Sequence, residues 1–204
     1  MEFVRVPAGP FLMGGAAGHP SERPVHEVWL DTFLIARTPA TNADYARYLA
    51  ATGAAPPPFW KDAAFADPLQ PVVGLGWEEA AAFAVWAGAR LPTEAEWEKA
   101  ARGGLRGALY PWGEARPSGS FDRPPRVGAT PANPLGLTDL AGVCHEWCAD
   151  WREPGPPRGP RRRASRGGSW RHAVRWSSPA TSSSLPPDYR YSDYGFRVLR
   201  EAVE

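Results

Sequence analysis

The chain has 204 residues, of which 43% are hydrophobic, and a formal net charge of +1. This length suits one domain with a sizeable core, and the near-zero charge provides no global field to attract nucleic acid or an anionic membrane. No apolar stretch approaches the roughly 18 residues of a membrane-spanning helix, and we identify no signal peptide. We therefore expect no nucleic-acid or membrane partner and a cytoplasmic location, with surface display by another route left open.

Cysteine is rare, with only Cys144 and Cys148 in the chain. Because the two lie in one local segment, they cannot cross-link distant parts of the fold, and the chain is not a disulfide scaffold. Together with His145 they offer too few ligands for a closed zinc site without a ligand from elsewhere. The scarcity of Lys, Asn and Gln beside abundant Arg and Pro is typical of a thermophile or of a GC-rich genome.

Strand-like patterns dominate the first part of the chain. Residues 3–13 predict two short strands separated by a Pro-Ala-Gly-Pro turn, and residues 14–24 predict a loop. Residues 25–35 have strand propensity throughout, and we expect Val28, Leu30 and either Phe33 or Leu34 in the core.

Three helices are predicted in the middle of the chain. The first spans residues 41–51, with Thr41 as its N-cap and a glycine after its end. The second spans residues 77–89, where bulky and small side chains alternate as in a buried, closely packed helix. The third starts at a capping box formed by Thr93 and Glu96 and stops near Arg102, before two glycines.

Irregular segments separate the remaining patterns, so the fold class is predicted as α+β with much coil. Residues 103–134 are rich in Gly and Pro. Residues 154–165 predict another loop, whose three consecutive arginines are typical of a solvated face. Residues 166–200 have ordered ends, Gly-Gly-Ser-Trp and Gly-Phe-Arg-Val, around a run with neither a helical nor a strand period. Such segments often carry binding residues; the alternative is a solvated loop without a role.

Seven fragments, read in order, resemble the formylglycine-generating enzyme (sulfatase-modifying factor) family over nearly the whole chain. The resemblance implies one domain, residues 1–204, with a C-type-lectin-like fold of low regular secondary structure. It also implies that the tryptophans within the shared motifs, at positions 97, 112, 147, 151 and 170, serve as core or scaffold. The fragments are PAGPFLMG (7–14), RLPTEAEWE (90–98), YPWG (110–113), NPLGLTDLAG (133–142), EWCADW (146–151), RGGSW (166–170) and GFR (195–197).

The enzymes of this family bind copper and activate oxygen with two cysteines that follow the Gly-Gly-Ser-aromatic motif, and soft thiolates suit Cu(I). The corresponding positions here are His172 and Ser177, so we expect no copper site and no formylglycine synthase activity. Sulfoxide synthases that share the fold bind iron through a His-rich motif on an extra helical domain, whereas this chain has four scattered histidines. An oxidase with altered metal ligands remains the alternative function.

A third group that shares the fold is the variable proteins of diversity-generating retroelements, whose ligand-binding surface lies between Gly-Gly-Ser-Trp and Gly-Phe-Arg. This resemblance implies a non-catalytic ligand-binding protein with a diversified surface at residues 171–194, within a variable region at 166–200. Adenine-directed mutagenesis cannot produce Lys, Glu, Gln, Met or Trp from the codons that it diversifies, and within 171–194 only Trp176 falls outside the permitted set. The tyrosine-rich run 189–194 suits a binding surface.

We expect a protein or another macromolecule as the partner and assign no catalytic residue. His172 is predicted as a contact residue, with general-base and metal-ligand roles as alternatives. The candidate ligand-binding residues are Arg171, His172, Ala173, Arg175, Trp176, Ser177, Thr181, Ser182, Asp188, Tyr189, Tyr191, Ser192, Asp193 and Tyr194.

The resemblance also implies a structural Ca²⁺ site at Asp139, Gly142, Cys144 and Glu146. The two acidic residues would supply carboxylate oxygens and the other two backbone carbonyls, which are ligands that hard Ca²⁺ prefers. The alternative prediction is a hydrogen-bonded turn in which Glu146 pairs with an arginine.

Overall fold

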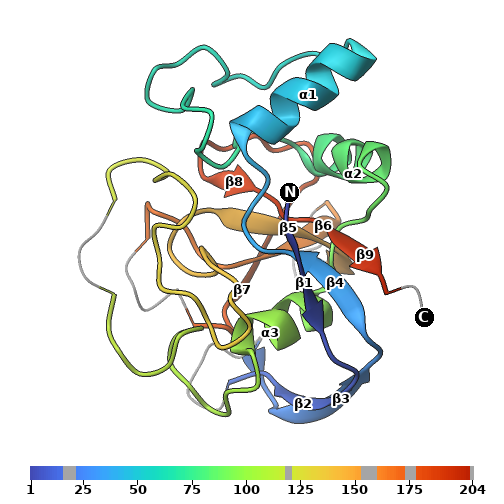
Figure 1. The fold of residues 1–204 in the computed structure, drawn as a ribbon, viewed down its shortest axis with the longest axis vertical. Coiled ribbons are helices and arrows are strands. Elements are labelled where there is room, and N and C mark those ends of the chain that lie inside the picture. The colour runs from blue at the N-terminus through green and yellow to red at the C-terminus, as the bar shows by residue number, and fades with distance from the viewer. Residues whose placement is uncertain (16–21, 118–120, 153–159, 173–177, 203–204) are drawn as a thin grey trace.

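The computed structural model describes residues 1–15, 22–117, 121–152, 160–172 and 178–202. Within these residues the fold is α+β, with three sheets and three helices joined by long coil segments (Figure 1). Helices α1 and α2 lie at one end of the molecule and the β2–β3 ribbon at the other. The coil of residues 103–117 and 121–144 covers one flank. This architecture confirms the predicted fold class.

One sheet joins the two ends of the described chain. Strand β4 (Phe33–Ala36) lies between β1 (Phe3–Val6) and β9 (Leu199–Glu201), and both pairings are antiparallel. Phe33 and Ile35 are buried on its inner face. The stretch of strand propensity at residues 25–35 contains two strands, because the chain leaves one sheet after Leu30 and enters another at Phe33.

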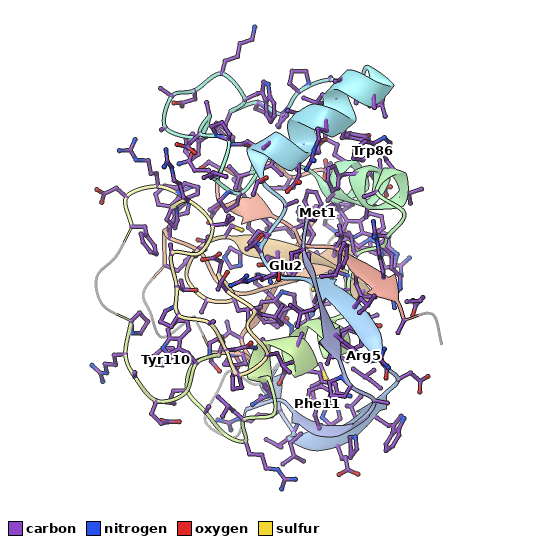
Figure 2. All side chains as sticks on the ribbon, in the orientation of Figure 1. Met1, Glu2, Arg5, Phe11, Trp86 and Tyr110 are labelled. Atoms are coloured by element: carbon purple, nitrogen blue, oxygen red, sulfur yellow. The ribbon has the colours of Figure 1, made fainter. Side chains whose placement is uncertain are left out.

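A two-stranded ribbon precedes that sheet in the sequence. Strands β2 (Gly9–Met13) and β3 (His26–Leu30) pair antiparallel. Val28 and Leu30 are only half-buried, because the ribbon lies at the periphery. Figure 2 shows Phe11 of this ribbon at the end of the molecule opposite to Trp86.

The three helices are α1 (Asn42–Thr52), α2 (Trp77–Trp86) and α3 (Glu94–Arg102). Thr41 and Thr93 cap α1 and α3 through capping boxes, and both helices end at a glycine in the left-handed conformation. These features confirm the predicted starts and stops. Helix α2 is shorter than predicted, and Trp86 at its end is 42% exposed.

A four-stranded sheet, ordered β7-β6-β5-β8, carries the C-terminal half of the chain. Its strands are β5 (His145–Arg152), β6 (Arg162–Arg166), β7 (Ser182–Leu185) and β8 (Tyr194–Gly195). Residues 154–165 and 171–194 were predicted to be irregular. Strands β6, β7 and β8 correct this prediction. Strand β7 has the sequence SSSL, which lacks a hydrophobic pattern; its order comes from antiparallel pairing with β6.

The arginine run before residue 165 is not a uniformly solvated face, because Arg163 is buried. Its guanidinium lies 3.4 Å from the ring centroid of Trp77 and 3.7 Å from that of Trp151. Such cation–π contacts stabilise a desolvated guanidinium. Trp151 itself is 40% exposed, so its indole is not part of the core.

Two clusters form most of the core. One gathers Tyr45 of α1, Phe83 of α2, Trp147 of β5 and Phe196. The other packs Trp97 of α3 against Ile35, Leu199 and their neighbours. Trp97 and Trp147 are fully buried, whereas Trp112 and Trp170 are half-buried. Within the described residues, no helix has the length and apolarity needed to cross a membrane.

Candidate ligand-binding hollow

Two buried arginines fix the ends of the C-terminal segment. The guanidinium of Arg166, in the RGGSW motif, donates to Glu94 and Glu98 at 2.8 Å each. It also donates to the carbonyl oxygens of Pro179 and Ala180 at 3.2 Å. These two carbonyls belong to the chain just before β7, so the Arg166 side chain connects β6 with the start of β7.

Arg197 fixes the other end. Its guanidinium binds both carboxylate oxygens of Glu146, at 2.6 and 2.7 Å, and neither side chain is exposed. The same guanidinium donates to four backbone carbonyls, those of residues 36, 37, 138 and 139. The indole of Trp97 donates to Glu146 as well. The RGGSW and GFR motifs are therefore structural elements of the frame.

Between these ends the surface has a hollow of about 720 Å³. Its wall consists of β7, the turn after the Gly-Gly-Ser-Trp motif, the first residue of β5 and the segment before β8. We call it the β7 hollow. Its lining residues are His145, Arg171, His172, Thr181, Ser182, Ser183, Ser184, Leu185, Tyr191, Asp193 and Tyr194.

Half of the predicted ligand-binding residues line this hollow, namely Arg171, His172, Thr181, Ser182, Tyr191, Asp193 and Tyr194. Three others lie outside its lining: Asp188, Tyr189 and Ser192. Tyr189 is 42% exposed, with its ring centroid 5.6 Å from that of Tyr191. The remaining four, Ala173, Arg175, Trp176 and Ser177, lie outside the described residues.

The lining also includes residues that were not predicted, and His145 is the most consequential. Backbone pairing places it beside Asp193, because the His145 N–H donates to the Asp193 carbonyl at 2.8 Å. His172 reaches the same place from the turn after Trp170. One side-chain ligand atom from each of His145, His172 and Asp193 lies within 4.8 Å of the other two, so this group could hold a metal ion.

Serine hydroxyls hold the group in place. Ser169 Oγ lies 2.7 Å from Asp193 Oδ2 and 2.8 Å from His172 Nδ1. Ser183 Oγ lies 3.4 Å from His145 Nδ1 and 2.7 Å from Ser165 Oγ.

Burial decides the protonation of two rings beside the hollow. It lowers the pKa of His145 to about 4, against the opposing effect of Asp193 and with a further lowering by His172. The His145 imidazole is therefore neutral at pH 7 and keeps one nitrogen lone pair. The Tyr194 ring stacks on His145 at a centroid distance of 4.7 Å, and burial raises its pKa. Tyr194 is thus a neutral phenol.

Neither cysteine is placed for thiolate chemistry. Cys144 and Cys148 are buried as free thiols, and burial raises the pKa of both well above the ordinary value. Nucleophilic attack and metal ligation require the thiolate. Both side chains are therefore neutral thiols at pH 7.

The residues of the predicted calcium site do not fit the ion in this arrangement. The Asp139 carboxylate accepts from three backbone N–H groups, those of residues 128–130, and from the Thr138 hydroxyl. Both Glu146 oxygens are bound by Arg197. A calcium ion would have to displace these donors, and the arrangement instead matches the alternative prediction, a turn with Glu146 paired to an arginine.

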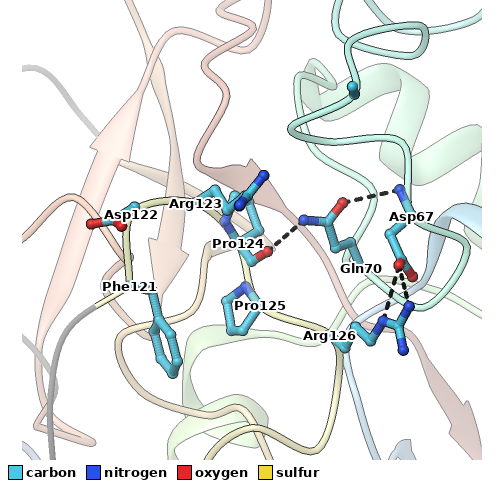
Figure 3. A pocket seen from close by; sticks show the side chains of 9 residues that line it. Asp67, Gln70, Phe121, Asp122, Arg123, Pro124, Pro125 and Arg126 are labelled. Carbon is cyan, nitrogen blue, oxygen red and sulfur yellow. Dashed lines mark hydrogen bonds and ion pairs between the residues drawn. The ribbon is translucent and has the colours of Figure 1, made fainter.

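A second hollow, of about 460 Å³, lies between the segments around Asp67 and Arg126 (Figure 3). Four of its lining residues already bind one another in two pairs. The Arg126 guanidinium donates to Asp67 at 2.6 and 2.9 Å, and the Gln70 amide donates to the Pro124 carbonyl at 2.7 Å. These contacts join two coil segments, so the β7 hollow is the better candidate site.

Comparison with known proteins supports the fold described above. Residues 1–202 match the Sulfatase-modifying factor enzyme 1-like domain. The chain is 36% identical to the serine/threonine-protein kinase pkn1 of Chlamydia caviae, with 98% of this chain and 38% of that protein covered. It is 35% identical to the formylglycine-generating enzyme of Streptomyces coelicolor, with 98% of this chain and 89% of that enzyme covered.

Among solved structures, Treponema denticola variable protein 1 shares the fold, with a TM-score of 0.81 and 24% identity. The alignment covers 98% of this chain and 95% of that one. The chain spans only 38% of the kinase relative, so the match there concerns one part of a longer protein. The chain belongs to the family of sulfatase-modifying factor enzyme 1-like domains.

Proposed function

We propose that this chain is a non-catalytic ligand-binding protein that presents the β7 hollow to a protein ligand, as the variable protein of a diversity-generating retroelement. One observation carries the proposal: Arg166 and Arg197, in the motifs at the two ends of the segment, are buried and fixed, while the surface between them is hollow and lined by chemically varied side chains. Tyr191 and Arg171 are exposed there. A rigid frame that supports aromatic and polar contacts suits recognition.

Two further observations support the proposal. His172 stands at a position where the enzymes carry a cysteine. The soft ligand that their copper chemistry needs is therefore missing at this position. The fold likeness to a Treponema denticola variable protein extends over nearly the whole chain.

The decisive test of the diversification is genomic. A near-repeat of the DNA that encodes residues 166–200, differing from it mainly at adenines and lying beside a reverse transcriptase gene, is the expected finding. A complete locus without such a repeat would contradict the retroelement assignment.

A display library tests binding at the protein level. Arg171, Tyr189 and Tyr191 would be randomised together, and a matched library would randomise Val85, Leu109 and Trp29, which are exposed elsewhere. Sorting both libraries on one immobilised probe protein, such as lysozyme, should enrich binders only from the first. Equal enrichment from the two libraries would argue against a dedicated binding surface.

The group formed by His145, His172 and Asp193 favours a second candidate function, a metal-dependent oxidase with altered ligands. Oxygen consumption with a cysteine-containing peptide and added iron or copper separates the two candidates. A binding protein gives no turnover. Turnover that His172→Ala abolishes would establish the oxidase and overturn the binding function.

A further inference from the structure

Three elements bring together a mixed set of nitrogen and oxygen donors at the buried side of the β7 hollow. His145 is the first residue of β5, Asp193 directly precedes β8, and these strands pair in parallel. His172 comes from the turn after Trp170, where its backbone N–H donates to the Ser169 carbonyl at 3.0 Å. The sheet register and this turn both fix the positions of the three side chains before any ligand binds.

Ser169 determines which nitrogen of His172 is free. A carboxylate only accepts hydrogen bonds, so the Ser169 hydroxyl donates its proton to Asp193 Oδ2. The hydroxyl oxygen must then accept from His172 Nδ1–H, at 2.8 Å. In the neutral imidazole this leaves the lone pair on Nε2. Outer hydrogen bonds of this kind orient metal-ligating histidines in proteins.

The donor set selects the class of ion. Two imidazoles and one carboxylate suit Zn²⁺, Co²⁺, Ni²⁺ or Fe²⁺, whereas Ca²⁺ and Mg²⁺ prefer oxygen ligands alone. Cu(I) prefers thiolates, and neither Cys144 nor Cys148 belongs to this group. Three protein ligands also leave at least one coordination position open.

We propose that His145, His172 and Asp193 form a binding site for one divalent transition metal ion of the zinc type, with its open position toward the β7 hollow. Ser169 is a positioning residue of this site. The inference does not depend on the proposed binding function, because metal uptake is measured with no ligand present.

Titration of the chelator-treated protein with Co²⁺ tests the site, since the visible absorption of Co²⁺ reports nitrogen and oxygen ligation. We expect saturation at one equivalent and displacement of Co²⁺ by Zn²⁺. His172→Ala and Asp193→Asn should each weaken Co²⁺ binding at least about tenfold, and Ser169→Ala by about 10- to 100-fold. His26→Ala is the matched control, because this imidazole lies on the exposed β3 strand, and it should leave the titration unchanged.

Three results would overturn the site: no saturable Co²⁺ binding by the wild-type protein, unchanged affinity in both ligand variants, or a sulfur-to-cobalt charge-transfer band. Thermal unfolding of each variant without metal shows whether it is folded. His172 is exposed, so its truncation should preserve the fold even if Asp193→Asn does not. Failure of the metal site would leave the binding function standing, and a failed display experiment would leave the metal site standing.

Discussion

The ion pair between Arg197 and Glu146 lies entirely inside the protein, and its loss is the clearest test at the scale of single residues. Arg197→Met removes one charge and leaves the Glu146 carboxylate buried without its partner. We expect the free energy of unfolding, measured with urea, to fall by about 3–5 kcal/mol. The matched control is Arg37→Met, because Arg37 pairs with Glu2 at the exposed surface; it should cost at most about 1 kcal/mol. Equal losses in the two variants would refute the framework role of Arg197.

The three residues of the proposed metal site show how far the sequence could predict the site. His172 and Asp193 were predicted as ligand-binding residues because they lie between two framework motifs. His145 was considered only beside its neighbouring cysteines, since nothing local in the sequence connects it with residue 193. The parallel pairing of β5 with β8 brings the two together, and such long-range register has no signal in a short window of sequence. The replacement of the family's cysteine by His172 was the hint that the sequence offered.

Among the elements, helix α3 contacts three strands of the four-stranded sheet through the Glu94 carboxylate. Glu94 accepts from Arg152 of β5, Arg166 of β6 and Ser182 of β7, at 2.6–2.8 Å. Burial alone would raise the pKa of Glu94, but Arg166 and Arg152 outweigh it and hold the pKa below the usual value. A lowered pKa stabilises the folded state above the unfolded-state pKa, about 4.3, and this stabilisation is lost as the pH falls through the lowered value.

Glu94→Gln should therefore reduce the acid sensitivity of the fold. We expect the variant to be less stable than the wild type at pH 7 and to lose less unfolding free energy between pH 5 and pH 2.5. Urea unfolding at a series of pH values measures this loss. Glu27→Gln, on the exposed face of β3, serves as the control and should follow the wild-type curve. A Glu94→Gln curve parallel to the wild type would contradict the role of this carboxylate.

Local chemistry explains which elements the sequence could predict. The ends of α1 and α3 are set by a capping threonine before each helix and a left-handed glycine after it, so a window of one helix length contains the whole signal. Strand β7 consists of three serines and a leucine, and its order depends on β6, which lies about 20 residues earlier. Strand β6 in turn contains Arg163, whose burial depends on Trp77 and Trp151. Strands β6 and β7 are therefore stabilised by residues that are distant in the sequence.

At the scale of the whole molecule, the last residues of the described chain connect both core clusters. Phe196 packs with α1, α2 and Trp147, whereas Leu199 packs with α3 and β4. Arg197 lies between these two positions in the sequence and is bound to backbone carbonyls on two other segments. Because Phe196 and Leu199 lie only three residues apart in the chain and pack in different clusters, neither cluster can lose its packing without disturbing the other.

The packing of Phe196 and Leu199 in the two clusters predicts that residues 1–204 unfold as one cooperative domain. Leu199→Ala should cost about 2–5 kcal/mol and Phe196→Ala about 3–5 kcal/mol, and each variant should shift a single transition seen alike by near-UV and far-UV circular dichroism. Val85→Ala is the control, since Val85 is 74% exposed and should change stability by no more than about 0.5 kcal/mol. Separate transitions in either core variant would show two independent units. They would also mean that the frame around the β7 hollow can loosen without the rest of the fold, because Phe196 and Arg197 belong to that frame.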